Sequence, residues 1–175
     1  DPPTSTERRV AVSVRSGVTW SWQAELARTI AMPEGSGFGH ALKLSGDRVI
    51  VGAPVLESSD IVHPGAAFIY ERVGGTWTGV RLPAPGVTPD AALGRGVGLS
   101  GTVACVGAPS EDTGDGPSGG ALRIYTRGAA GWSLQQRVVA GVFDGLGYAC
   151  AVDGDAVFVL NPGSRVVYVM RQVQG

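Results

Sequence analysis

Short apolar runs, separated by glycine and proline, extend along almost the whole chain. In residues 38–44 apolar positions alternate with small or polar ones, a period of two that is typical of a β-strand. The residues expected on one face of this strand are Phe38, His40, Leu42 and Leu44. After a turn at residues 45–47, the apolar run Val49–Val51 predicts a buried second strand, which ends before Pro54 because proline cannot extend the ladder.

This pattern occurs three times along the chain. FGHALKLSGDRVIVGAP (38–54) returns as LGRGVGLSGTVACVGAP (93–109) and as LGYACAVDGDAVFVLNP (146–162), at steps of 55 and 53 residues. A second element, GAAFIYER (65–72), returns as GALRIYTR (120–127), and Trp77 and Trp132 keep the 55-residue step. Each unit predicts four short antiparallel strands, like one blade of a β-propeller.

The repeat boundaries predict an all-β chain with a single propeller domain over residues 1–175. We expect a partial blade at 8–30, blades at 37–83 and 92–139, and a partial blade at 145–172. Residues 22–30 have helical propensity, but their alignment with 132–138 favours a strand. The chain supplies about three blades, whereas closed propellers have about four to eight. Either two chains form a six-bladed homodimer, or the chain is a fragment of a larger propeller.

Composition indicates a globular chain that neither binds nucleic acid nor inserts into a membrane. The 14 basic and 15 acidic residues are scattered and the net charge is −1. No apolar run approaches the roughly 18 residues that a membrane helix needs. The first residues, DPPTSTERR, lack the apolar region of a signal peptide, but because the chain starts with Asp this says little about secretion.

Both cysteines are expected at core positions. Cys105 stands where the other units have Ile50 and Phe158, and Cys150 stands where they have Leu42 and Val97. We favour buried free thiols that act as small hydrophobic side chains. A disulfide between adjacent blades is the other interpretation.

No group of residues predicts catalysis. Residues 116–120 satisfy GxSxG, but they lie in a polar loop without the strand and helix that a nucleophile elbow requires. Residues 96–101 satisfy GxGxxG within a strand and turn, with no helix to receive a phosphate. His40 and His63 lie near no plausible soft metal ligand. We therefore expect neither an enzyme nor a bound cofactor.

Loops between the second and third strands are the expected binding region, because they differ most in length between units. The candidate binding residues are Asp60, His63, Glu111, Asp112 and Asp115. Three carboxylates within residues 110–119 could bind Ca²⁺ weakly, but we interpret this segment as a solvated loop and assign no metal site. The equivalent Trp20, Trp77 and Trp132 are expected to pack between outer strands, with sugar stacking as the alternative.

The FG pair at 38–39 and the GAP elements at 52–54 and 107–109 resemble FG-GAP repeats, the blades of the integrin α-chain head and of many bacterial cell-surface and secreted proteins. The resemblance covers about residues 8–172. It implies a noncatalytic extracellular or cell-surface module for binding or adhesion, which recognises protein or glycan through its blade loops. The alternatives are a multivalent sugar-binding lectin and a structural or accessory propeller of a larger protein. Many FG-GAP blades hold Ca²⁺ in a DxDxDG loop, but the turns here read SGD, SGT and DGD, so that metal site is not transferred.

Overall fold

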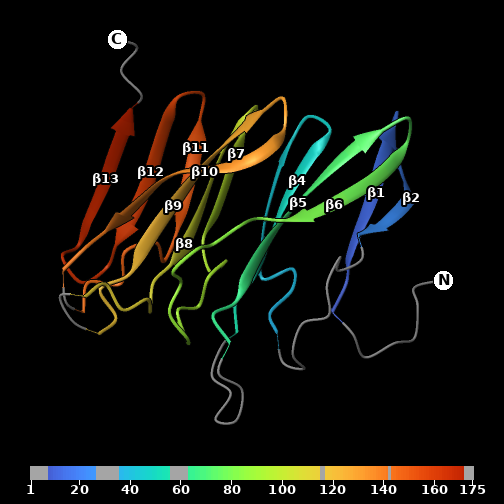
Figure 1. The fold of residues 1–175 in the computed structure, drawn as a ribbon. Helices are drawn as coiled ribbons and strands as arrows, with labels where there is room; N and C mark the ends of the chain where they lie inside the picture. Colours follow the sequence, from blue (N-terminus) through green and yellow to red (C-terminus); the bar gives the residue numbers. More distant parts are fainter. Residues whose placement is uncertain (1–7, 27–35, 56–62, 115–116, 142, 172–175) are drawn as a thin grey trace.

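The computed structural model describes residues 8–26, 36–55, 63–114, 117–141 and 143–171. Within these ranges the regular structure is entirely β, with thirteen strands in four antiparallel sheets that lie side by side in chain order (Figure 1). The strands are β1 (Val10–Ser16), β2 (Thr19–Leu26), β3 (Ala41–Ser45), β4 (Arg48–Ala53), β5 (Ala66–Val73), β6 (Thr76–Arg81), β7 (Val97–Ser100), β8 (Val103–Ala108), β9 (Ala121–Gly128), β10 (Gly131–Val139), β11 (Cys150–Asp153), β12 (Ala156–Asn161) and β13 (Val166–Arg171). No helix in the described part of the chain could span a membrane.

Two of the sheets confirm the predicted unit of four short strands. In β3–β6 and β7–β10 each strand pairs with the next along the chain. The first sheet contains only β1 and β2, and the last contains only β11, β12 and β13. The preference for a strand at residues 22–30 is confirmed as far as Leu26, and the rest of that segment lies outside the described residues.

The predicted position of Phe38 on the first strand is wrong. Strand β3 begins at Ala41, and Gly39 has a φ of +83°, a left-handed conformation that interrupts the alternation. The ring of Phe38 is buried, with its centroid 5.7 Å from that of Phe68 in an edge arrangement. Phe38 therefore belongs to the core between the first two sheets, whereas Leu42 on β3 is 46% exposed.

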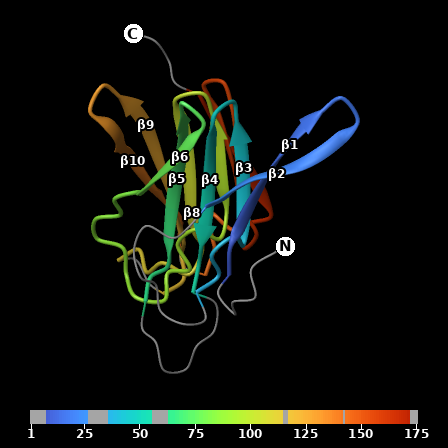
Figure 2. The same cartoon turned by 90° about the vertical axis from the view of Figure 1, so that its right-hand side faces the viewer.

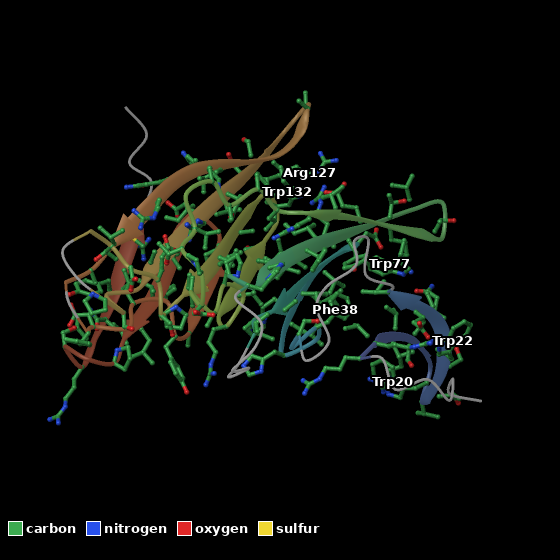
Figure 3. All side chains as sticks on the ribbon, turned by 60° about the horizontal axis from the view of Figure 1, so that its bottom comes forward. Trp20, Trp22, Phe38, Trp77, Arg127 and Trp132 are labelled. Atoms are coloured by element: carbon green, nitrogen blue, oxygen red, sulfur yellow. The ribbon has the colours of Figure 1, made fainter. Side chains whose placement is uncertain are left out.

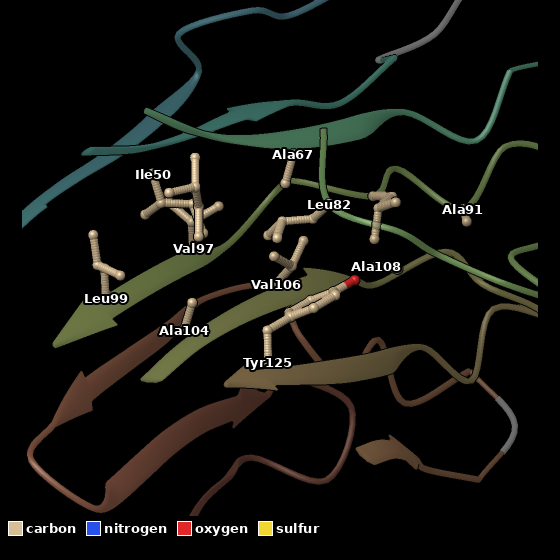
Figure 4. Close-up of a cluster of buried hydrophobic side chains, with 12 residues drawn as sticks. Ile50, Ala67, Leu82, Ala91, Val97, Leu99, Ala104, Val106, Ala108 and Tyr125 are labelled. Carbon is tan, nitrogen blue, oxygen red and sulfur yellow. The ribbon is translucent and has the colours of Figure 1, made fainter. Parts of the chain in front are cut away.

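Each pair of neighbouring sheets encloses its own apolar core. The core between β3–β6 and β7–β10 combines Ile50 and Ile69 of one sheet with Val97, Leu99 and Tyr125 of the other (Figure 4). A second core joins the hairpin β1–β2 to β3–β6, and a third joins β7–β10 to β11–β13. The sheets are thus stacked face to face like successive blades, and the hydrophobic effect holds each joint.

Glycines of the repeated motif allow the sheets to approach this closely. A Cβ on Gly52 would overlap the carbonyl oxygen of Gly94 in the next sheet, and a Cβ on Gly107 would overlap that of Gly147 in the same way. The glycine of each GAP element is therefore required because another backbone lies against it. In the last sheet Leu160 occupies this register position, since it pairs with Val167 as Gly52 pairs with Ala67.

The described residues do not close into a ring. Hairpin β1–β2 stands at one end of the row and β13 at the other (Figure 1), and Figure 2 views the row from the end of β1–β2. Leu42 and Leu44 are 46% and 68% exposed, while their equivalents Val97 and Leu99 are 4% and 5% exposed. Strands β3 and β4 of the preceding sheet pack against β7, which carries Val97 and Leu99. The described part of the first sheet has only β1 and β2 and no counterpart of these two strands, so Leu42 and Leu44 on β3 stay exposed.

The last sheet is open on its other face. Val167 and Val169 on β13 are 57% and 53% exposed. Their register equivalents Ala67 and Ile69 are 1% and 0% exposed, because the next sheet covers them. Within the chain, each joint between sheets buries one face of each of the two sheets. At the two ends of the row the equivalents of these two faces are exposed, one at each end.

Candidate functional site

The two ends of the strands differ in their connections. At one end short turns join the strands of each sheet; we call this end the turn face. At the other end lie the described parts of segments 54–65, 82–96, 109–120, 140–149 and 162–165; we call this end the loop face, and it is at the bottom of Figure 1. Loops on a rigid scaffold commonly carry binding function, so the loop face is the candidate site.

Backbone conformation separates the two faces sharply. On the turn face every described residue with a positive φ is a glycine. The non-glycine residues with a positive φ all lie on the loop face and are Asp90, Ala92, Ser118, Phe143 and Arg165, with φ between 52° and 58°. Such conformations cost free energy for residues with a Cβ, and they gather at functional sites when the surrounding structure enforces them.

Phe143 combines this strained backbone with an exposed aromatic ring. Its φ is +58° and its side chain is 72% exposed. The Phe143 N–H donates to the Pro117 carbonyl at 3.2 Å, and the Gly163 N–H donates to the Asp144 carbonyl at 2.9 Å. The backbone of Phe143 and Asp144 is thus held by hydrogen bonds, and the Phe143 ring is presented to solvent.

A buried ion pair supports the central loop of this face. Glu111 and Arg123 are both 0% exposed, and the Arg123 guanidinium donates to both oxygens of the Glu111 carboxylate. Arg137 on β10 adds a hydrogen bond from Nε to Glu111 Oε1 at 2.9 Å. The Glu111 carboxylate is therefore bound by two arginines of the same chain, and it anchors segment 109–120 to β9 and β10.

Sequence reasoning did not find this ion pair, although a signal exists. Arg123 stands at the register position of Phe68, which is fully buried in the other complete sheet. A charged residue at a core position requires an opposite charge nearby. The acid that satisfies it lies in the predicted solvated loop.

Asp112 and His63 are the other candidate residues that the structure describes. Asp112 is exposed, and its Oδ1 accepts a hydrogen bond from the Ser118 N–H at 3.0 Å. Its own N–H donates to Thr88 Oγ1 at 3.1 Å, which ties segment 109–120 to segment 82–96. His63 Nδ1 accepts from the Gly65 N–H at 3.1 Å. Burial, together with the nearby Arg81, lowers the pKa of His63.

Three of the five candidate residues are described, and they do not form a metal-binding group. Asp60 and Asp115 lie outside the described residues. Within the described ranges no three His, Cys, Asp or Glu side chains are placed to hold a metal ion. Phe143 was not among the candidates, because an apolar residue in segment 140–149 gives no signal in the sequence of exposure or of backbone strain.

The repeated tryptophans mark contacts between sheets. Trp132 Nε1 donates to Glu71 Oε1 at 3.1 Å, and Arg127, its cross-strand partner, donates to both oxygens of Glu71 (Figure 3). Trp77 and Arg72 donate in the same way to Gln23 Oε1. Packing between sheets is thus what the structure shows for Trp77 and Trp132, whereas Trp20 is 66% exposed and no sheet precedes its hairpin among the described residues.

Glu71 on β5 is the charged centre of the contact between sheets β3–β6 and β7–β10. Arg48 on β4 also donates to its Oε1, at 3.0 Å. These bonds, first of all those from Arg127, lower the pKa of Glu71 from 4.5 to about 2, although partial burial opposes the shift. Glu71 is thus an anion that joins two sheets on the side of the molecule away from the loop face.

No protein-family model matches the sequence, and no similar sequence was found among curated proteins. The resemblance to FG-GAP repeats therefore rests on the motif residues themselves. The function must be argued from the loop face.

Proposed function

We propose that this chain is a noncatalytic recognition module that binds a protein or glycan ligand through its loop face. The observation that carries this proposal is the restriction of positive-φ non-glycine residues to that face, with the exposed ring of Phe143 among them. Strained backbone persists where the surrounding structure enforces it. Exposed aromatic rings held in place by their neighbours are typical anchors of binding surfaces.

Hydrogen bonds between the segments of the loop face support this proposal. Segment 109–120 is bonded to segment 82–96 through Thr88 and to segment 140–149 through the Leu146 N–H, which donates to the Gly119 carbonyl at 3.1 Å. Three segments, which connect strands of three successive sheets, are therefore hydrogen-bonded into one surface. A surface of this kind is organised before a ligand arrives, which reduces the entropy lost on binding.

The propeller is part of the same proposal. Four-stranded sheets that stack face to face in chain order resemble consecutive propeller blades. The glycine contacts occur at the joint between the two four-stranded sheets and again at the joint with sheet β11–β13. An extracellular or cell-surface location follows from the resemblance to FG-GAP repeats alone.

The six-bladed homodimer stays a prediction. The exposed apolar faces at the two ends of the row are in its favour, because Leu42 and Leu44 are equivalent to residues that cover a neighbouring sheet. The number of strands is against a simple version: the described residues of two copies bring 26 strands, whereas six four-stranded blades need 24. Light scattering tests it, and a mass of 17.9 kDa at micromolar concentration would exclude it.

Binding is tested with matched variants on the two faces. Phe143→Ser removes the exposed ring of the loop face, and Val73→Ser removes an equally exposed apolar side chain (75%) beside a turn of the other face. A glycan array and a peptide display library are screened with the wild type, and each ligand is then measured by calorimetry. We expect Phe143→Ser to weaken binding at least tenfold, and Val73→Ser to leave it unchanged. Ligands that bind both variants equally well, or no ligand on either platform, would count against the proposal.

A further inference from the structure

Cys105 and Cys150 meet inside the joint between the last two sheets. Cys105 lies in the middle of β8 and is 0% exposed, and Cys150 is the first residue of β11 and is partly buried. Their sulfur atoms are 2.7 Å apart. The two residues come from strands of different sheets that contact each other directly. They are therefore placed where a covalent bond would join one sheet to the next.

The repeat places Cys105 and Cys150 at positions that also meet in the preceding joint, where both side chains are aliphatic. In the preceding joint the equivalent residues are Ile50 and Val97, which pack in the same apolar core. Gly98 lies opposite Cys105 across β7 and β8, and a Cβ on Gly98 would press against the Cys105 sulfur. The missing side chain at residue 98 thus leaves room for the two sulfurs.

A metal site does not explain the pair. Structural zinc sites use four ligands, and here two thiols meet among apolar residues such as Leu122 and Val157. In the described part of the chain no third His, Cys, Asp or Glu side chain completes a metal-binding group around them. Two sulfurs in contact on separate sheets fit a different chemistry, the formation of a disulfide.

We propose that Cys105 and Cys150 are an oxidation site that forms a disulfide between successive sheets, with a small-molecule disulfide such as oxidised glutathione as the oxidant. The Cys150 thiolate attacks the glutathione disulfide, forms a mixed disulfide and releases one glutathione. Cys105 loses its proton, its sulfur attacks Cys150 Sγ, and the second glutathione leaves. In total two protein thiols are oxidised and one disulfide is reduced to two thiols.

The order of these steps follows from burial. Cys150 is partly accessible, whereas Cys105 is enclosed. Burial, together with the neighbouring Cys150 thiol, raises the pKa of Cys105 well above its usual value of 9.0. Cys105 is thus a poor first nucleophile, but its sulfur is already in contact with the mixed disulfide that Cys150 forms.

The test uses the reduced 175-residue protein, equilibrated with oxidised and reduced glutathione at several ratios. Intact mass and peptide mapping should show the loss of two hydrogen atoms and a linked Cys105–Cys150 peptide. A disulfide that closes a loop of this length should lower the equilibrium constant of unfolding by about 30- to 1,000-fold, and reduction should reverse the change. Brief alkylation of the reduced protein should label Cys150 before Cys105.

Cys150→Ala is the control variant, since it changes the less buried partner. Its urea unfolding should be the same under oxidising and reducing conditions, and Cys105→Ser provides a second control if it folds. The proposal is wrong if the wild type, at excess oxidised glutathione, keeps both thiols or carries only glutathione on Cys150. It is equally wrong if the linked cysteines come from two different chains.

Discussion

Substitution of Gly107 by alanine tests the stacking of the sheets on which the other conclusions depend. Gly107 has an ordinary strand conformation, without a positive φ, so its backbone accepts alanine readily. Taken alone, the change should stabilise the fold by about 0.4–1 kcal/mol, because alanine restricts the unfolded chain. The new methyl group, however, would overlap the carbonyl oxygen of Gly147 in the next sheet. Any loss of stability therefore measures the contact between sheets and not strand propensity.

The size of the loss follows from how far the sheets must move. Ordinary contact with a Cβ begins near 3.4 Å, so the two backbones must separate by about 1 Å or more. A gap of that size removes about a quarter to a half of the dispersion energy across the joint, where Leu122, Leu146 and Val159 are almost fully buried. Overpacking of this kind costs about 1–3 kcal/mol. After subtraction of the gain from alanine, we expect Gly107→Ala to lower the free energy of unfolding by about 1–2 kcal/mol, and the melting temperature by about 2–8 °C.

Urea denaturation followed by tryptophan fluorescence measures this difference. Gly128→Ala is the matched control, because Gly128 ends β9 of the same sheet without a positive φ, and a Cβ there would meet nothing within 4 Å. The control should be unchanged or slightly more stable than the wild type. If Gly107→Ala is as stable as Gly128→Ala, the sheets are not packed through their glycines, and the assignment of successive blades is refuted.

Further predictions concern the ion pairs and the loop face. Glu71→Gln should reduce the pH dependence of stability. Since the folded pKa of Glu71 is lowered from 4.5 to about 2, the wild type should keep the stability that Glu71 contributes above pH 4.5 and lose it towards pH 2. In urea titrations the difference in free energy of unfolding between wild type and variant should therefore shrink by about 1 kcal/mol over that range, a value that allows for solvent screening. Arg123→Met should cost about 3–5 kcal/mol because it leaves the Glu111 carboxylate buried beside Arg137 alone, and adding Glu111→Leu should recover most of that loss in the same assay. A double variant no better than the single one would contradict the buried-charge explanation. Phe143→Gly should raise the free energy of unfolding by about 0.5–1 kcal/mol by relieving its positive φ, yet weaken ligand binding, and a loss of stability would show that the conformation is not strained.

Strand order could be predicted from the sequence because it depends on local signals. Alternation, glycine turns and prolines recur in each unit, and antiparallel neighbours joined by two-residue turns leave little freedom in pairing. The error at Phe38 has a physical cause as well. Glycine permits a left-handed conformation without requiring it, so the break at Gly39 could not be distinguished from a continuous strand.

The candidate site was less predictable because its properties depend on contacts between distant segments. Glu111 lies among Asp, Ser and Gly residues, a composition that normally indicates a solvated loop, yet its partners come from β9 and β10. Residues 143–146, which carry the Phe143 ring, are hydrogen-bonded to residues 117–119 and to Gly163, and the chain brings these segments together only after the sheets have stacked. Local pattern therefore predicts the scaffold, and the stacking of the scaffold determines the surface.

The last unit shows how far the repeat can be extended. Its motif reads LNP in place of GAP, so Leu160 stands where Gly52 and Gly107 lie against the next sheet. A further sheet packed as the others are would place its backbone in the space of the Leu160 side chain. The exposed Val167 and Val169 still favour a covering partner, because burial of apolar side chains away from water lowers the free energy. Whatever covers this face, a second copy of the chain included, must therefore sit farther out or at another angle than the sheets within the chain.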